Sequence, residues 1–130
     1  MDGIHYRARA PLRLGLAGGG TDVEPYASKK GGAVFNTTIN RYAYCTITPT
    51  EDHSMSVHST DYGKFKAPLD GGPLNLDGNM DLIKAVTNHF EITDGFRMFL
   101  QSEAPPGSGL GGSSTVIVSI IAAMCEWQGI

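Results

Sequence analysis

The chain has 130 residues, a net charge of −3 and an apolar fraction of 41%, which together predict one globular domain of ordinary soluble composition. Because no long run of Lys and Arg occurs, the composition argues against a duplex nucleic-acid binder, and nucleic acid is not an expected partner. No stretch is long and apolar enough to span a bilayer, and the first residues lack a signal-peptide pattern. The expected compartment is the cytoplasm, without a membrane partner.

The first part of the chain is predicted to contain a strand and a short helix. Apolar residues alternate with arginines over 4–16, which is strand periodicity interrupted at Pro11. Thr21 or Asp22 is expected to cap a short helix that Gly31 and its neighbouring glycine close. The chain therefore begins with one extended segment and one helical turn or two.

Four further extended segments are predicted in the middle of the chain. Residues 33–36 and 41–48 have strand composition, the second being rich in Tyr, Thr and Ile. Residues 55–59 and 62–66 have the length and spacing of a hairpin. These segments indicate that most of the first half of the chain belongs to a sheet.

Helices dominate the second half. Residues 67–79 are rich in Gly and Pro and are expected to be a loop, and 80–90 carry apolar residues at helical spacing. A strand is expected over 96–101, followed by a glycine-rich loop and a helix over 113–127. The order of elements predicts an α+β domain with a mixed or mostly antiparallel sheet.

The last predicted helix is apolar on nearly all sides, so it needs cover from several directions. This pattern suggests that the domain is incomplete as given. We expect a second copy of the chain to cover the helix, which would make the protein a homo-oligomer.

Glycine is the unusual residue type, with 17 of 130 positions, many of them in clusters over 15–20, 71–78 and 107–112. Fixing glycine costs backbone entropy, so such clusters indicate tight turns or a backbone that must approach a ligand. The third cluster lies in the segment Pro-Pro-Gly-Ser-Gly-Leu-Gly-Gly-Ser-Ser over 105–114, directly before the last helix. Its unshielded N–H groups and the helix N-terminus predict a phosphate-binding loop.

This loop also has simpler and competing interpretations. A serine N-cap after a flexible turn would need only one or two glycines. A Walker A loop fails, because Ser113 stands where the lysine belongs. The spacing of Gly107, Gly109 and Gly112 formally matches the dinucleotide fingerprint, so an oxidoreductase is an alternative, although the preceding elements lack the Rossmann pattern.

The other unusual stretch covers 9–22, where Arg13, a triple-glycine turn and Asp22 fall close together. Arginine suits bidentate contact with phosphate or carboxylate, and an aspartate beside a glycine turn can accept hydrogen bonds from sugar hydroxyls. A surface arginine and a helix-capping aspartate are the simpler interpretations. The stretch predicts a ligand site with both a cationic and an acidic member.

Together the two stretches resemble the GHMP kinase superfamily, which includes galactokinase, homoserine kinase and mevalonate kinase. The loop before the last helix is similar to that family's P-P-x-x-G-L-G-[SG]-S motif, and the first stretch to its A-P-x-R…T-D motif. The segments RAPLRLGLAGGGTD and APPGSGLGGSSTVIVSII most resemble the subgroup of D-glycero-D-manno-heptose 7-phosphate kinases.

The resemblance implies a fold and a domain organisation. Residues 1–130 would form a single GHMP-kinase N-terminal domain, a ribosomal-protein-like βαβ domain with a mixed sheet and packed helices. The C-terminal GHMP domain would be absent. The fragment would then be inactive alone, because the resemblance places the catalytic base and a second Mg²⁺ ligand beyond the phosphate loop.

The resemblance also implies roles for individual residues. Arg13 would be catalytic, and Ser113 would ligate Mg²⁺. The sugar would bind at Gly19, Gly20, Thr21 and Asp22. The phosphates of ATP would bind at Pro106, Gly107, Ser108, Gly109, Leu110, Gly111, Gly112, Ser113 and Ser114. One departure from the commoner motif is Gly112, which replaces a serine and should leave the Mg²⁺ ligand intact.

The implied activity is transfer of a phosphoryl group from ATP, with Mg²⁺, to the anomeric hydroxyl of a heptose 7-phosphate. Such chemistry depends on positioning and charge neutralisation rather than on covalent catalysis. Two alternatives remain: a galactokinase-like or other sugar kinase of the same superfamily, and a non-catalytic nucleotide- or anion-binding or oligomerising module.

Overall fold

The computed structural model describes residues 3–130, and within that range it contains one mixed five-stranded sheet and three helices. The strands are β1 (Tyr6–Ala17), β2 (Phe35–Pro49), β3 (Ser54–Ser59), β4 (Gly63–Pro68) and β5 (Phe96–Ser102). The helices are α1 (Tyr26–Lys30), α2 (Asp81–His89) and α3 (Gly112–Gln128). The strand order is β1-β2-β5-β3-β4, with β3 and β5 parallel and the other pairs antiparallel. The predicted α+β class with a mixed sheet is confirmed.

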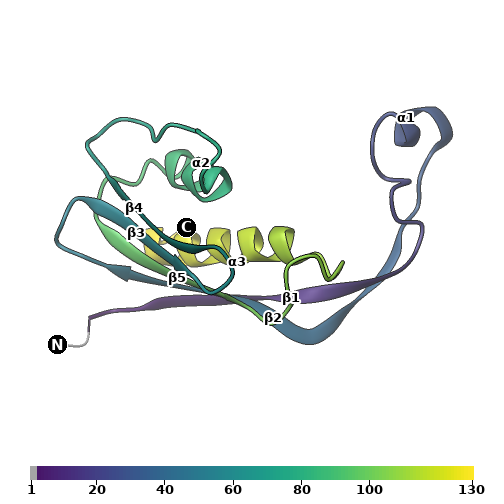
Figure 1. Cartoon of the computed structure of the whole chain (residues 1–130), viewed down its shortest axis with the longest axis horizontal. Helices are drawn as coiled ribbons and strands as arrows, with labels where there is room; N and C mark the ends of the chain where they lie inside the picture. The colour runs from purple at the N-terminus through teal and green to yellow at the C-terminus, as the bar shows by residue number, and fades with distance from the viewer. Residues whose placement is uncertain (1–2) are drawn as a thin grey trace.

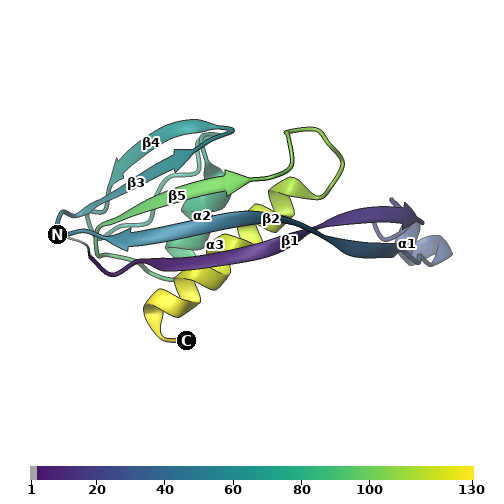
Figure 2. The same ribbon diagram turned by 90° about the horizontal axis from the view of Figure 1, so that it is seen from below.

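One face of the sheet carries the core, and α2 and α3 cover that face (Figures 1 and 2). Apolar residues point to it from alternate positions of each strand, because successive side chains in a strand face opposite sides. The fully buried residues include Cys45, Ile47, Met55, Phe96, Ile120 and Met124. Figure 2 shows the strands in front of both helices, so the opposite face of the sheet has no helix on it.

A two-stranded arm projects beyond this body (Figure 1). We define the arm as residues 13–38, which comprise the distal parts of β1 and β2 and the tip that contains α1. Strand β5 pairs with β2 only from Ala43 to Pro49, so the arm has no third strand. Its apolar side chains, such as Leu16 and Phe35, are therefore exposed.

Strand β2 differs from the sequence expectation. Two strands were predicted over 33–36 and 41–48, whereas the structure has one continuous strand that begins at Phe35 and ends at Pro49. The two predicted strands leave a gap at residues 37–40, Thr-Thr-Ile-Asn. Pairing with Leu14 and Arg13 of β1 holds Thr37 and Thr38 extended, whereas residues 39–41 lie opposite Leu12 alone, at one of two irregularities in the register.

The predicted N-cap of α1 was wrong, and α3 starts one residue earlier than expected. Helix α1 begins after Pro25 without a side-chain cap, so neither Thr21 nor Asp22 serves as its N-cap. Helix α3 begins at Gly112, one residue earlier than expected, and its N-cap is Gly111 in a left-handed conformation. Ser113 therefore lies inside the first turn, where its hydroxyl does not fill the capping position.

Helix α3 is less exposed than its composition suggested. Residues such as Ser119, Ile120 and Met124 are buried against the sheet. Val118 and Ile121 remain exposed on the opposite side, at 55% and 40%. Only one face of the helix is thus left uncovered, rather than several. The expected homo-oligomer stays a prediction. No helix among residues 3–130 is long and apolar enough to cross a membrane.

A buried lysine fastens the loop over 69–80 to α2. The Nζ of Lys84 lies 2.6 Å from a carboxylate oxygen of Asp77, and the lysine side chain is only 4% exposed. The ammonium also lies 5.0 Å from the centre of the Phe65 ring. The hydrogen bond from Lys84, and then the backbone N–H of Asn79, hold the pKa of Asp77 below its ordinary value.

This pair predicts a pH-dependent contribution to stability. Because the folded pKa of Asp77 lies below its unfolded value, the stabilisation is complete above the unfolded pKa of about 4 and is lost as pH falls through the folded pKa. We expect Asp77→Asn to lower the urea midpoint at neutral pH but not near pH 2. Asp70→Asn, an exposed residue of the same loop, is the control. An equal loss at both pH values would contradict the assignment.

Candidate functional site

The loop between β5 and α3 has an unusual backbone. Gly107, Gly109 and Gly111 have φ values of 78°, 75° and 73°, so every second residue adopts the left-handed region. Glycine reaches this region without the steric cost that other residues meet. Alternation of backbone handedness turns successive N–H groups toward one concavity, which is how anion-binding nests form.

Most amides of this loop have no protein acceptor. The N–H of Ser108 donates to the carbonyl of Pro105 at 3.2 Å, and that of Thr115 donates to the carbonyl of Gly111 at 3.0 Å. Within residues 3–130, the N–H groups of 109–114 donate to no backbone or side-chain oxygen. Free donors and the positive end of the α3 dipole therefore coincide at one place.

The serines and the threonine at the start of α3 differ in their roles. The hydroxyl of Thr115 donates to the carbonyl of Gly111 at 2.7 Å and so fastens the first turn. Ser113 and Ser114 are exposed, and among the described residues their hydroxyls have no partner. Both hydroxyls are therefore free to contact a ligand.

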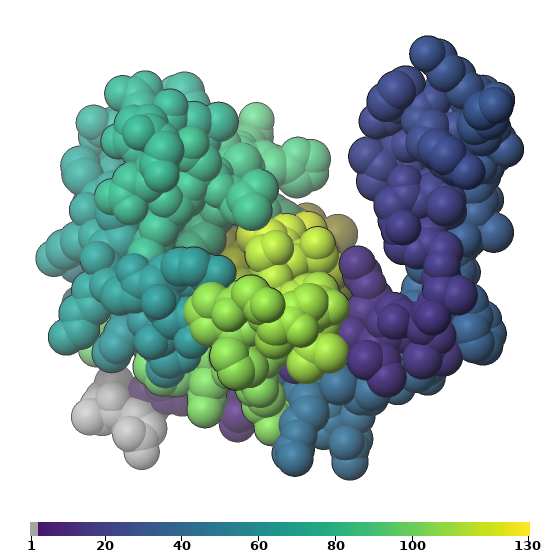
Figure 3. Space-filling view, turned by 45° about the vertical axis from the view of Figure 1, so that its right-hand side comes forward, coloured from purple at the N-terminus to yellow at the C-terminus, as the bar shows by residue number. Residues whose placement is uncertain are grey.

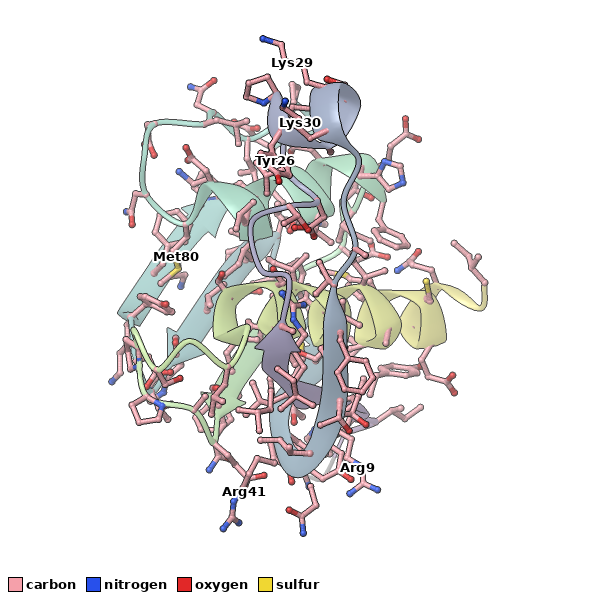
Figure 4. The ribbon with its side chains drawn as sticks, turned by 90° about the vertical axis from the view of Figure 1, so that its right-hand side faces the viewer. Arg9, Tyr26, Lys29, Lys30, Arg41 and Met80 are labelled. Carbon is pink, nitrogen blue, oxygen red and sulfur yellow. The ribbon has the colours of Figure 1, made fainter. Side chains whose placement is uncertain are left out.

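Two neighbouring cavities adjoin the loop. The first has a volume of about 280 Å³ and lies between the loop and the turn at Asp61 and Tyr62. The second, of about 410 Å³, shares Tyr62, Ser113 and Val116 with the first. Its other walls are largely apolar and come from α2 and the residue before it, from β5 and from α3 (Met80, labelled in Figure 4, Leu82, Ile83, Leu100 and Ile117).

Arg13 meets the loop, although it lies almost one hundred residues earlier in the chain. Its backbone N–H donates to the carbonyl of Leu110 at 3.2 Å. Its guanidinium lies over Gly111, where an added Cβ would stand 3.2 Å from the Cζ of the arginine. The absence of a side chain at Gly111 thus makes room for the cation beside the free amides.

The tip of the arm is held by its own glycines and by Thr21. The hydroxyl of Thr21 lies 2.7 Å from the carbonyl oxygen of Gly18 and accepts a hydrogen bond from the N–H of Ala33 at 3.1 Å. A Cβ at Gly18 would stand 1.9 Å from the oxygen of Ala33, and a Cβ at Gly32 the same distance from the oxygen of Thr21. The two sides of the tip therefore touch without space for side chains.

The predicted sugar-binding residues do not lie at the loop. Gly19, Gly20, Thr21 and Asp22 are at the tip of the arm, which Figure 1 shows well apart from the start of α3. Asp22 is exposed, and no hydrogen bond to its carboxylate is present within residues 3–130. Figure 3 shows a hollow between the arm and the body. The structure brings Arg13 and residues 106–114 together and leaves these four across the hollow.

Sequence reasoning missed several residues around the loop. Asp61 and Tyr62 line its cavity because β3 runs parallel to β5, and the N–H of Thr60 donates to the carbonyl of Leu100 at 3.2 Å. That pairing joins segments about forty residues apart, and no local sequence pattern predicts it. Thr115 could have been predicted from the sequence, because it lies in the first turn of the expected helix.

The chemistry of the site is that of anion binding. Among residues 3–130, no group of three His, Cys, Asp or Glu side chains could hold a metal ion. The donors present are backbone amides, two free hydroxyls and one guanidinium, all of which suit phosphate oxygens.

Comparison with known proteins agrees with this geometry. A family model described as the GHMP kinases N terminal domain matches residues 80–130. The fold is similar to the crystal structure of a D-glycero-D-manno-heptose 1-phosphate kinase from Bacteroides thetaiotaomicron, with a TM-score of 0.85, 40% identity, and coverage of 98% of this chain and 43% of that one. Residues 80–130 thus match the GHMP kinase N-terminal domain, and nearly the whole chain shares the fold of a heptose-phosphate kinase.

Two further comparisons extend this likeness. The chain is 40% identical over 126 residues to the D-glycero-alpha-D-manno-heptose 7-phosphate kinase of Campylobacter jejuni, covering 93% of this chain and 37% of the relative. A galactokinase from Lactococcus lactis, solved with galactose, shares the fold at a TM-score of 0.76, with 22% identity and coverage of 97% of this chain and 33% of that one. The chain thus spans less than half the length of these relatives.

Proposed function

We propose that this domain binds ATP as the N-terminal part of a kinase that phosphorylates the anomeric hydroxyl of a heptose 7-phosphate. The observation that carries the proposal is the set of unpartnered amides over 109–114, which converge with Arg13 at the start of α3. The acceptor sugar is inferred from the name of the Campylobacter jejuni relative.

The triphosphate is proposed to lie against residues 106–114. Amides and a helix dipole bind phosphate without side-chain charge, and Arg13 adds a cation that neutralises charge developing during transfer. Mg²⁺ usually keeps several water molecules and binds through one or two protein ligands and the phosphates themselves. The free hydroxyl of Ser113 suits one such ligand, and when bound the ion would neutralise the phosphates.

The adenine base is proposed to occupy the largely apolar cavity beside the loop. This cavity shares Tyr62, Ser113 and Val116 with the loop cavity, so base and phosphates can belong to one molecule. A planar base gains from burial against apolar and aromatic side chains, as most ligand pockets show.

The sugar is proposed to lie in the hollow between the loop and the tip of the arm. Asp22 would accept hydrogen bonds from sugar hydroxyls, while Gly19 and Gly20 would let backbone approach the ring. Thr21 would contribute by fastening the tip, because its hydroxyl is already engaged with Gly18 and Ala33. Since both ligands are phosphorylated metabolites, we propose the cytoplasm as the compartment.

A second candidate is a nucleotide-binding module without turnover. It is favoured for this chain assayed alone, because the chain spans 37–43% of the two heptose-kinase relatives. In addition, Asp61 is the one carboxylate among the described residues that line the loop cavity. The third candidate is a galactokinase-like sugar kinase, which the similarity of fold to the Lactococcus lactis galactokinase suggests.

Calorimetry with Mg²⁺–ATP, run beside a phosphorylation assay with heptose 7-phosphate and with galactose, tests these candidates. We expect ATP binding, weakened by about ten- to a hundredfold in Arg13→Ala, because a charge-assisted contact contributes about 1.5–3 kcal/mol. Arg9→Ala, on the same strand but on the outer face, should bind like the parent. Absence of ATP binding would reject the proposal, and binding without phosphorylation of either sugar would select the module.

A further inference from the structure

The uncovered face of the sheet is strongly basic. The strands hold seven of the ten Lys and Arg residues of a chain whose net charge is −3, and no Asp or Glu lies in any described strand. On the outer face, five of them are exposed: Arg7, Arg9, Lys64, Lys66 and Arg97. Within residues 3–130, the recorded ion pairs involve only Arg41 and Lys84, so these five cations have no carboxylate partner within 4.0 Å.

The strand register arranges these residues in rows across the sheet. One row runs through Arg7, Thr46, Phe99, His58 and Lys64. The next row runs through Thr48, Arg97, Ser56 and Lys66. With strands about 4.8 Å apart, the first row is about 19 Å long and the second about 14 Å. A depression of about 370 Å³ lies between the rows, lined by residues that include Thr46, His58 and Arg97.

Aromatic rings lie between the charges. Phe99 is 41% exposed and meets the ring of His58 edge-on, with centroids 5.3 Å apart. The guanidinium of Arg7 lies 4.9 Å from the centre of the Tyr44 ring, and that of Arg9 lies 4.4 Å from the centre of Tyr42. Nucleic-acid bases stack on both aromatic rings and guanidinium planes, so the face offers several stacking surfaces.

The composition of the face decides among possible occupants. A second copy of the chain bound through the same face would place like charges together. A lipid surface would need protruding apolar side chains, and Phe99 is the one large apolar side chain exposed there among the described residues. Cations, hydroxyls and rings in rows on an open sheet suit an extended chain that carries both phosphates and bases.

We propose that the outer face of the sheet binds single-stranded nucleic acid, with its phosphates on Arg7, Lys64, Lys66 and Arg97 and a base on Phe99. This departs from the sequence-based expectation of no nucleic-acid partner, which rested on the absence of a basic run. Strand alternation disperses these cations along the chain, and only the sheet gathers them. The face lies opposite α3 and its loop, so the proposal does not depend on the kinase function (Figure 2).

Fluorescence anisotropy with a labelled oligouridylate of about twelve nucleotides tests the proposal at rising salt. We expect binding at about 50 mM salt that weakens with a log–log slope of magnitude up to about 2.8, the value for four phosphate contacts to a single strand. The double variant Lys64→Glu with Arg97→Glu should weaken binding at least about tenfold. Phe99→Ala should weaken it about fivefold or more with an unchanged slope, because stacking is not ionic.

A charge-matched control separates this face from the general charge of the protein. Lys29→Glu with Lys30→Glu changes net charge equally at the tip of the arm, where both lysines stand at the far end from Arg9 and Arg41 in Figure 4. The control should retain binding within about twofold. The proposal would be overturned if the oligonucleotide did not bind, or if both double variants lost affinity equally. It would also be overturned if duplex RNA bound equally well, or if polyglutamate or anionic vesicles competed as effectively as unlabelled RNA.

Discussion

Replacement of Gly111 by alanine is expected to lower the affinity for Mg²⁺–ATP by about ten- to a hundredfold. Gly111 has a φ of 73° and is the N-cap of α3, so alanine would strain the start of the helix. Its Cβ would also stand 3.2 Å from the Cζ of Arg13 and displace the guanidinium. A single methyl group would therefore disturb the amides and the cation together.

Calorimetry on folded protein checks this result, with circular dichroism to show that α3 is retained. The control is Gly72→Ala, because φ at that residue is not left-handed and its Cβ would meet only the Asp70 side chain, at 3.9 Å. An unchanged ATP affinity in Gly111→Ala would mean that nucleotide does not bind at this loop.

Replacement of Phe96 by alanine is expected to lower the free energy of unfolding by about 3–5 kcal/mol. Phe96 is fully buried at the start of β5, and its ring centroid lies 5.4 Å from that of Trp127 at the end of α3. The substitution would remove a large apolar side chain and leave a cavity between the sheet and the helix. A loss of this size approaches the whole stability of a small domain.

Urea unfolding followed by Trp127 fluorescence measures the effect. Phe99→Ala is the matched control, since Phe99 lies three residues further on the same strand but on the open face. Its loss should fall within about 1 kcal/mol, because surface substitutions away from special features cost little. Similar losses in the two variants would contradict the assignment of the faces, and a folded Phe99→Ala variant also makes the RNA-binding test interpretable.

The phosphate-loop segment could be predicted from the sequence because its signals are local. Glycines at alternate positions imply left-handed backbone, and a loop that ends at a helix leaves amides free whatever the rest of the fold does. The alternation over residues 6–12 and the helical spacing of 81–89 are equally local. The cap of α1 was predicted wrongly, because the hydroxyl of Thr21 bonds across the tip of the arm to Ala33.

By itself, the sequence determined the α+β class, the glycine loop before α3 and the presence of Arg13 and Asp22 as chemical groups. The tertiary structure decided that Arg13 lies on the loop while Asp22 stands on an arm away from it, and that dispersed arginines and lysines share one open face. Spacing along a chain specifies conformation over a few residues, whereas pairing of distant strands specifies which residues meet. The parallel pairing of β3 with β5 and the long register of β1 on β2 carry that second kind of information.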